Sequence, residues 1–551
     1  MPTFTINDRE LTVPDGTTIL QAALANGIDI PHYCYHHGLS IAGNCRVCLV
    51  EIEKFPKPAI ACNTVVTDGM VVRTESEKVH GWRESVTEFL LANHPLDCPI
   101  CDQAGECRLQ EYSYQHGVRT SRFREEKEHG PKRRELGPHV LFDWERCIKC
   151  TRCIRFCEEV PKTGELGMFL RGVREEVGVF PGRPLDNPYS GNVVDLCPVG
   201  ALTLREFRFR SRVWFVTDVP SVCPGCARGC SVNLGTLRNE IYRITPRTNQ
   251  DVNRWWICDE GRLWNRRLME TRGERLVTPR SSSGSNEGDW DAVTGEAVQV
   301  LAAAAKNGKL RVLASPRASV EETWILAKLA AGPLAGAPVY LPVHERGEDD
   351  DLLIRKDRSP NFRGARLVLE ALAGGAKEIS ALERDLEEGE VDALLVVGPG
   401  LLGPVQDEAP CVSGELLAKA GKVVTIDAYP SAFSTAAAIV LPAASYAETG
   451  GVYINFAGRA QYAEKALLSG NASRPAYMIL ADLLDELSSE KAPPPATVLG
   501  RVSEEVPALK NIDWDALPAS AGQDVEGAAA ADHACKATGA AARMLASGWK
   551  L

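Results

Sequence analysis

Residues 34–62 read CYHHGLSIAGNCRVCLVEIEKFPKPAIAC and carry four cysteines with the spacing C-x10-C-x2-C-x13-C. Three of the thiols lie close together on one loop and the fourth returns from a predicted strand, which suits a [2Fe–2S] cluster. Gly38 and Gly43 allow the loop to wrap a cluster and to direct backbone N–H groups at its sulfides. Zinc is the alternative, because four cysteines also suit Zn²⁺. The predicted ligands are Cys34, Cys45, Cys48 and Cys62.

The segment before this loop predicts a small β/α unit. Residues 3–6 alternate like a strand, and residues 11–13 are the expected hairpin partner. A helix is expected to start after residues 15–17 and to end at Gly27, which suits a C′ position.

A second ligand group lies in residues 93–107, NHPLDCPICDQAGEC. Helical periodicity over residues 79–91 places His94 just beyond a predicted helix end. A lone histidine is more often a surface or satisfied core residue, but this one stands just before Cys98. A neutral imidazole in place of a thiolate removes a negative charge and raises a cluster's potential, as in Rieske centres. The predicted [4Fe–4S] ligands are His94, Cys98, Cys101 and Cys107.

The third group begins with C-x2-C-x2-C and ends at a distant cysteine followed by Pro198, which is half of the bacterial ferredoxin pattern. Its predicted ligands are Cys147, Cys150, Cys153 and Cys197. In two-cluster ferredoxins, a cysteine in the position of Cys157 serves the other cluster. No second C-x2-C-x2-C lies between Cys157 and Cys197, so we expect Cys157 to be a buried thiol without a ligand role.

The fourth group has the spacing C-x2-C-x3-C-x27-C and follows residues 214–216, which are predicted as a strand. Four thiolates again suit a [4Fe–4S] cluster, with zinc as the alternative. The predicted ligands are Cys223, Cys226, Cys230 and Cys258.

Composition limits the class of protein. The 551 residues exceed one ordinary domain, and 44% hydrophobic with 25% charged residues is typical of globular protein. The net charge of −11 argues against a nucleic-acid binder. No apolar run predicts a membrane span, and MPTFTINDRE at the start lacks a signal peptide's features, so a cytoplasmic location is expected. Cysteines in C-x2-C units in such a chain favour metal ligation over disulfides.

After residue 272 the composition changes, and residues 279–290 are expected to form a polar linker. Helices and strands then alternate, which predicts an α/β domain with a mostly parallel sheet. The expected helices are 291–306 and 320–331, and the expected strands are 310–314, 339–341, 393–397 and 423–426.

One motif in this domain has two interpretations. Gly398–Gly403 matches G-x-G-x-x-G after a strand, with Asp427 at the end of the next strand, as in a nicotinamide-binding fold. Pro404 and Pro410 interrupt the helix that should present its N-terminus to a pyrophosphate. A structural turn is therefore the preferred interpretation.

Three stretches together resemble a known family, the large iron–sulfur subunit of respiratory complex I. They are LDCPICDQAGECRLQ, RCIKCTRCIRFCEEV and DNPYSGNVVDLCPVGALT. The fourth group's spacing and residues 437–461 resemble molybdopterin oxidoreductases such as formate dehydrogenases. The resemblance implies a multidomain α+β and α/β chain with a β-grasp [2Fe–2S] domain, two [4Fe–4S] modules, and a truncated molybdopterin oxidoreductase-like domain. The implied domains are 1–78, 79–118, 119–212, 213–272 and 273–514, with an Ala/Gly-rich tail at 515–551.

The resemblance also implies a function. The chain is expected to relay electrons within an NADH–quinone oxidoreductase, with one [2Fe–2S] and three [4Fe–4S] clusters and no catalytic residue of its own. Implied partners are an NADH-oxidising FMN flavoprotein, a thioredoxin-like [2Fe–2S] subunit, a two-cluster ferredoxin-like subunit and the quinone-site subunits, on the cytoplasmic face of the inner membrane. No molybdenum is expected, because the later cysteines, Cys411 and Cys535, are not where a metal ligand should lie. The alternatives are a formate dehydrogenase-like catalytic subunit and an electron-transfer subunit of an NAD(P)-linked hydrogenase.

Overall fold

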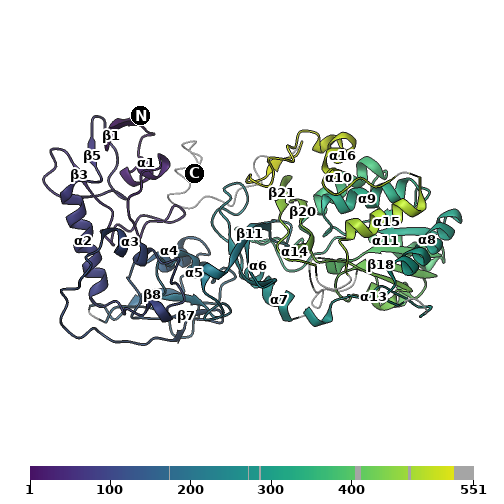
Figure 1. Cartoon of the computed structure of the whole chain (residues 1–551), viewed down its shortest axis with the longest axis horizontal. Coiled ribbons are helices and arrows are strands. Elements are labelled where there is room, and N and C mark those ends of the chain that lie inside the picture. The colour runs from purple at the N-terminus through teal and green to yellow at the C-terminus, as the bar shows by residue number, and fades with distance from the viewer. Residues whose placement is uncertain are drawn as a thin grey trace. The chain divides into compact units, whose positions relative to one another are not determined.

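The computed structural model divides the chain into two compact units, one ending at Val216 and the other beginning at Thr217. We describe each unit by itself (Figure 1). The structure describes residues 1–526 except 173, 271, 285–286, 402, 404–410, 470–472 and 490. Cys535 and most of the expected tail therefore lie outside the described residues.

The first unit opens with a five-stranded mixed sheet in the order β2-β1-β5-β3-β4 around one helix, as expected of a β-grasp domain. The strands are β1 (Thr3–Ile6), β2 (Arg9–Thr12), β3 (Leu49–Ile52), β4 (Ala59–Ile60) and β5 (Val71–Arg73). Helix α1 (Ile19–Ala25) begins with a capping box in which Thr18 and Gln21 satisfy each other's backbone N–H groups. Its apolar side packs on the sheet in one buried core.

A helical hairpin follows, formed by α2 (Glu77–Ala92) and α3 (Arg108–His116). The hydroxyl of Ser76 caps α2 by accepting the N–H of Val79. The predicted helix is confirmed, and His94 lies just past its end. The short 3-10 helix η1 (Cys98–Ile100) carries the start of the second cysteine group between the two helices.

The next segment is built from short elements around the third cysteine group. A sheet in the order β10-β7-β6 and a β8–β9 hairpin enclose two helices. The elements are β6 (Arg134–Glu135), β7 (Val140–Phe142), α4 (Arg152–Glu159), β8 (Leu166–Phe169), β9 (Glu176–Val179), α5 (Asn192–Leu196) and β10 (Leu202–Leu204). Lys149 and Thr151 adopt left-handed backbone angles, which wind the cysteine loop before α4 begins.

The predicted strand at residues 214–216 is wrong. Val213–Phe215 forms the 3-10 helix η2, and the first strand of the second unit, β11, begins at Thr217. A strand on a sheet buries alternate side chains, but Trp214 and Phe215 are both exposed, at 58% and 61%.

The second unit opens with an antiparallel meander of β11 (Thr217–Val222), β12 (Ser231–Leu237) and β13 (Glu240–Pro246). Helices α6 (Asp259–Arg262) and α7 (Trp264–Glu270) and the 3-10 helix η3 (Arg272–Glu274) follow.

The α/β domain of this unit has a six-stranded sheet in the order β14-β19-β18-β17-β15-β16. The strands are β14 (Arg280–Ser281), β15 (Leu310–Leu313), β16 (Val339–Tyr340), β17 (Ala393–Val397), β18 (Lys422–Asp427) and β19 (Ile439–Pro442). All neighbours are parallel except β14, so the predicted parallel sheet is confirmed. The expected linker at 279–290 needs correction, because Arg280–Ser281 pairs with β19 as an edge strand.

Helices surround this sheet in the green and yellow part of Figure 1. They are α8 (Trp290–Lys306), α9 (Val320–Ala331), α10 (Phe362–Leu372), α11 (Ile379–Glu387), α12 (Gly414–Leu417), α13 (Ala432–Ala436), α14 (Tyr446–Thr449), α15 (Ala476–Leu487) and α16 (Val498–Glu505), with 3-10 helices η4 (Pro399–Leu401) and η5 (Pro507–Leu509). A small sheet of β20 (Gly451–Ile454), β21 (Arg459–Ala463) and β22 (Gln523–Asp524) completes the unit. Among the described helices, none combines the length and apolarity needed to cross a bilayer.

Candidate metal centres

The first cysteine group lies on the loop between α1 and β3 and at the end of β4. Hydrogen bonds join the Cys34 thiol to Cys45 and Cys62, and the Cys48 thiol to Cys62. These shared bonds lower the pKa of Cys34 and raise the pKa of Cys45 and of Cys62, so the thiols titrate as one coupled group. Gly43 has a φ of +61°, and a Cβ there would lie 3.3 Å from the Ile60 side chain, so the loop's turn favours glycine.

The second group lies between α2 and α3. The thiols of Cys98, Cys101 and Cys107 interact electrostatically, and the backbone N–H groups of Leu109 and Gln110 donate to the Cys107 thiol. Burial lowers the pKa of His94 to about 4, so its imidazole is neutral near pH 7, as a metal ligand must be. The charged groups acting on His94 include Asp97, which directly precedes Cys98. His94 as a ligand stays a prediction.

The third group combines the loop before α4 with the end of α5. The Cys153 thiol interacts with those of Cys147, Cys150 and Cys197, so residues far apart in the sequence are neighbours here. Burial raises the pKa of Cys147 and of Cys197 to about 12. Buried thiolates need a compensating cation, which iron ions would supply.

Cys157 lies on α4 one turn after Cys153 and is fully buried. Its burial and the nearby carboxylates of Glu165 and Glu158 raise its pKa, so it is a neutral thiol. Cys157 is nevertheless a neighbour of the third group, because its thiol also acts on the pKa of Cys153. The expectation that Cys157 has no ligand role stays a prediction.

The fourth group belongs to the second unit, on the β11–β12 turn and at the start of α6. The four thiols interact with one another and are buried, which raises the pKa of Cys258 well above its usual range. The N–H of Cys223 donates to the carbonyl of Cys230 at 2.8 Å, and the N–H of Gly261 donates to the Cys258 sulfur at 3.4 Å. A Cβ on Gly261 would lie 2.8 Å from the Cys223 sulfur, so only glycine fits there.

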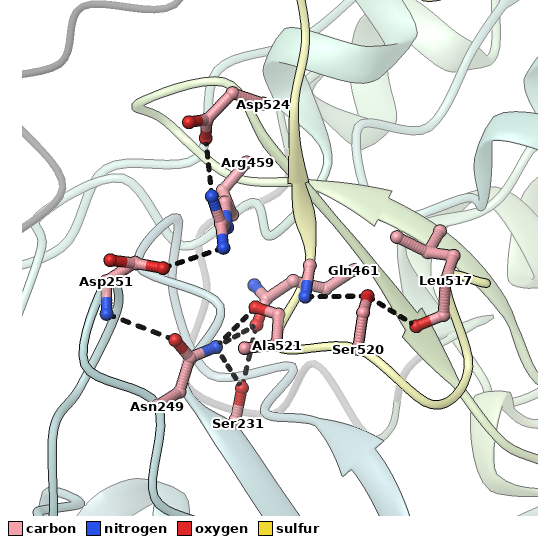
Figure 2. Close-up of polar contacts among 10 residues, drawn as sticks. Ser231, Asn249, Asp251, Arg459, Gln461, Leu517, Ser520, Ala521 and Asp524 are labelled. Carbon is pink, nitrogen blue, oxygen red and sulfur yellow. Dashed lines mark hydrogen bonds and ion pairs between the residues drawn. The ribbon is translucent and has the colours of Figure 1, made fainter. Parts of the chain in front are cut away.

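A polar network holds the fourth group's strand to the α/β domain (Figure 2). Ser231, which follows Cys230, donates its hydroxyl to the Gln461 side chain of β21 at 2.8 Å. Asn249 donates to the Ser231 hydroxyl at 2.8 Å and to the carbonyl of Ala521 at 2.7 Å. The last described segment therefore ties the meander and β21 together.

Arg459 of β21 reinforces this connection. Its guanidinium contacts Asp251 at 2.7 Å and Asp524 of β22 at 3.0 Å (Figure 2). The described part of the expected tail (515–551) thus includes a strand, β22, that pairs with β21.

Direct contacts in the first unit also join the first ligand group to the third. Arg155 of α4 donates to the carbonyl oxygens of Cys34 at 2.6 Å and Cys150 at 3.4 Å. The side-chain amide of Asn44 donates to the carbonyl of Lys149 at 3.2 Å.

A second set of contacts joins the third group to the second. The N–H of Arg108 donates to the carbonyl of Pro198 at 3.1 Å. Gly200 lies so close to the Cys101 sulfur that a Cβ there would overlap it. The third group therefore contacts both of the others, and the first and second also lie near each other, because the Arg108 guanidinium contacts the His32 ring at 3.0 Å.

The donor chemistry of all four groups fits iron–sulfur clusters, because each gathers thiols that interact and backbone N–H groups that point at sulfur. Most of these thiols are buried, whereas Cys98 of the second group is exposed. Within the described ranges, no three or more His, Cys, Asp or Glu side chains converge as the ligands of a single metal ion would. Sequence reasoning did not identify Arg155, Arg108, Gly200 and Gly261. For the two glycines a signal was available, because each stands three residues after a proposed ligand, Cys197 or Cys258. Neither arginine had such a signal.

The glycine turn after β17 has an internal partner. Asp427 is fully buried and accepts the Ala428 N–H at 2.9 Å and the Ser431 hydroxyl at 3.0 Å. A Cβ on Gly400 would lie 2.6 Å from this carboxylate. The carboxylate is therefore occupied in holding the turn, in line with the structural interpretation of the motif. Leu402, Pro404 and Pro410 lie outside the described residues.

The later cysteine that the structure describes, Cys411, is half-buried and packs against the apolar cluster that includes Val412 and Leu417. This apolar environment suits a cysteine that packs in the core of the domain.

Family models match five segments of the chain. They are a 2Fe-2S iron–sulfur cluster binding domain (1–77), the NADH-ubiquinone oxidoreductase-G iron–sulfur binding region (83–122), the ferredoxin-like domain of NADH-quinone oxidoreductase subunit 3 (137–203), the molybdopterin oxidoreductase Fe4S4 domain (216–268) and the molybdopterin oxidoreductase family (364–486). The chain is homologous to the large iron–sulfur subunit of NADH-quinone oxidoreductases. The predicted multidomain fold class is confirmed by these matches.

The corresponding NADH-quinone oxidoreductase subunit of Rickettsia bellii is 40% identical over 59% of this chain and 47% of its own length. The mitochondrial NADH-ubiquinone oxidoreductase 78 kDa subunit of Candida albicans is 41% identical over 58% of this chain and 44% of its own. The NADH-quinone oxidoreductase subunit of Streptomyces coelicolor is 36% identical over 74% of this chain and 48% of its own. The chain thus spans about half the length of these relatives.

A solved NAD+-reducing [NiFe]-hydrogenase in its H2-reduced state also matches a part of the chain. That chain is 30% identical, with a TM-score of 0.34, over 38% of this chain and 91% of its own length.

Proposed function

We propose that the chain is an electron-relay subunit of a proton-translocating NADH–quinone oxidoreductase. The observation that carries the proposal is the continuous contact of three ligand groups inside one unit. Arg155 contacts Cys34 of the first group and Cys150 of the third, and Arg108 joins Pro198 next to the third group to the second. An electron relay needs redox centres that lie close together, and contacts between their ligand groups would bring the centres close.

The proposed cofactors are one [2Fe–2S] cluster in the first group and one [4Fe–4S] cluster in each of the others. When bound, such clusters supply one-electron oxidation and reduction. The proposed ligands are Cys34, Cys45, Cys48 and Cys62; His94, Cys98, Cys101 and Cys107; Cys147, Cys150, Cys153 and Cys197; and Cys223, Cys226, Cys230 and Cys258. The domain boundaries expected from the sequence belong to the same proposal.

The chain's own residues hold and tune these centres and make no bonds in a substrate. Burial of the thiols other than Cys98 limits the access of water, and N–H groups such as those of Gly261 and Gln110 donate to sulfur, which favours the reduced state. His94, neutral near pH 7, would bring less negative charge than a thiolate. The second group would then have the higher potential, which suits a later position in the relay.

The proposed direction is based on the contacts of the third group with both of the others. Electrons from a flavoprotein that oxidises NADH at FMN would enter near the first and third groups and leave near the second toward a two-cluster ferredoxin-like subunit. A thioredoxin-like [2Fe–2S] subunit and quinone-site subunits complete the proposed assembly, on the cytoplasmic face of the inner membrane. The fourth group lies in the other unit and is proposed to be off this route, in a domain without molybdenum.

The proposal is tested with the chain assembled with its flavoprotein partner. NADH should reduce the first three clusters, as followed by EPR, and the iron content should match one [2Fe–2S] and three [4Fe–4S] clusters. Absence of reduction with both partner and NADH supplied would overturn the relay. Stoichiometric molybdenum or tungsten would favour the formate dehydrogenase-like alternative, and co-purification with hydrogenase subunits would favour the other.

A further inference from the structure

Helix α4 carries a buried arginine that contacts two cysteine groups. Arg155 is 8% exposed and follows Cys153 by two residues. Its guanidinium donates to the carbonyl oxygen of Cys34 at 2.6 Å and to that of Cys150 at 3.4 Å. It also donates to the carbonyl of Ser40 and, at 3.3 Å, to the hydroxyl of Thr151.

A second side chain of α4 holds the same loop. Glu159 lies one turn after Arg155 and accepts the N–H of Ser40 at 2.8 Å and the Ser40 hydroxyl. Residues four apart share one face of a helix, so both side chains reach Ser40 together. Three groups of Ser40, its carbonyl, its N–H and its hydroxyl, thereby fix the loop of the first group to the helix of the third group.

Arg152 of the same helix is a second buried cation beside these groups, since it donates to the carbonyls of Tyr35 and Leu196. We propose that Arg155 is a positioning residue that fixes the separation between the first and third clusters and, together with Arg152, supplies positive charge between them. The proposal rests on the ligand sets of the proposed function. With both clusters bound, transfer of one electron from the first to the third would oxidise one and reduce the other, with no bond formed and no proton moved. A path of covalent and hydrogen bonds leads from Cys34 through the guanidinium to Cys150.

The choice of arginine has a physical reason. Its planar guanidinium holds several N–H donors in a fixed fork and stays charged when buried. One of its nitrogens donates to the carbonyls of Cys34 and Cys150, and the other two donate to the Ser40 carbonyl and the Thr151 hydroxyl. The single nitrogen of a lysine ammonium cannot contact all four acceptors in that geometry. A buried positive charge beside two clusters stabilises their reduced, more negative states, because screening by water is weak there. It should therefore raise both midpoint potentials.

The test uses the full chain carrying its clusters and two substitutions at one position. Arg155→Met removes the fork and the charge, whereas Arg155→Lys keeps the charge and removes the fork. Arg134→Met is the control, because Arg134 lies in the same unit and binds Glu176 at 2.8 Å and the Val177 carbonyl at 2.6 Å, away from the ligands. The readouts are the dipolar coupling between the reduced first and third clusters by pulsed EPR and their midpoint potentials by redox titration.

We expect Arg155→Met to lose dipolar coupling and to shift both potentials downward, Arg155→Lys to lose coupling while keeping its potentials, and Arg134→Met to change neither. Unchanged coupling and potentials in Arg155→Met with full iron content would overturn the inference. If Arg155→Met fails to assemble its clusters, Arg155→Lys decides, since unchanged coupling there also overturns it. Failure of the proposed function is a different result, namely the absence of cluster signals from the unaltered chain.

Discussion

The backbone N–H of Arg108 donates a hydrogen bond of 3.1 Å to the carbonyl oxygen of Pro198. Arg108 follows the last cysteine of the second group, and Pro198 follows the last cysteine of the third. A single main-chain bond therefore joins two ligand groups whose final cysteines are far apart in the sequence. Because a main-chain bond does not depend on side-chain identity, this junction tolerates substitution at either residue better than the Arg155 contacts do.

Gly200 is the position where this junction has least room. A Cβ there would overlap the Cys101 sulfur, so Gly200→Ala should displace that ligand and remove most of the second cluster's iron and EPR signal. Gly81→Ala on α2 is the control, because nothing lies within 4 Å of the added methyl group. Full occupancy of the second cluster in Gly200→Ala would contradict the assignment of Cys101.

In the second unit, Gly261 likewise has no room for a side chain beside a proposed ligand. A Cβ at this position would lie 2.8 Å from the Cys223 sulfur, so Gly261→Ala should lose the fourth cluster while the first three keep their EPR signals. Gly295→Ala on α8, where the methyl group meets nothing within 4 Å, should keep all four. Simultaneous loss of every cluster in Gly261→Ala would argue against independent ligand groups in the two units.

His94 should act through its charge. His94→Cys replaces a neutral imidazole with a thiolate, so the second cluster should assemble with a lower midpoint potential. His94→Ala should lose the cluster or expose it to exchangeable ligands. Redox titration followed by EPR distinguishes the two variants, and a potential that is the same in His94→Cys and the unaltered chain would show that His94 is not a ligand.

Cys157 and Cys197 should respond differently to the same substitution. Cys197→Ser should lose the third cluster's signal. Cys157→Ser should keep it and should lower the free energy of unfolding by about 1–3 kcal/mol, because a hydroxyl replaces a fully buried thiol. EPR of both variants with chemical denaturation of Cys157→Ser provides the measurement. Loss of the cluster in Cys157→Ser alone would reverse the ligand assignment.

Glu321 should make the second unit less stable as pH rises. Burial raises its pKa to about 7, although it accepts the Val452 N–H at 3.0 Å. The folded state therefore binds the proton more tightly than the unfolded state, so this stabilising contribution is complete below about pH 4.5 and is lost as pH rises through 7.

Glu321→Gln should remove this part of the pH dependence, which is at most about 3 kcal/mol for the shift concerned. The measurement is thermal unfolding at pH 6 and pH 8. Glu486→Gln, at an exposed position of α15, is the control and should keep the original difference. The same difference in Glu321→Gln as in the unaltered chain would exclude Glu321 as its source.

Much of the fold could be predicted from local patterns. The apolar run ALLVV of β17 is buried along its whole length, as central parallel strands are, and the helices at 291–306 and 320–331 follow their periodicity closely. The strand predicted at residues 214–216 was wrong, because it relied on the strand preference of Trp214 and Phe215. Both side chains are exposed in a 3-10 helix instead. The short strand β14 has no signal of its own and exists because β19 offers it an edge.

The sequence by itself was enough to predict the four ligand groups, because metal ligation needs particular side chains at short, regular spacings. It did not determine their order in space, because that order depends on contacts between residues far apart along the chain. Only the tertiary structure decided that the third group contacts both the first, through Arg155, and the second, through Pro198 and Gly200. No spacing pattern in the sequence identifies such an arginine on a helix that carries cysteines. Its contacts exist only in the folded chain, where it is buried between Cys34 and Cys150.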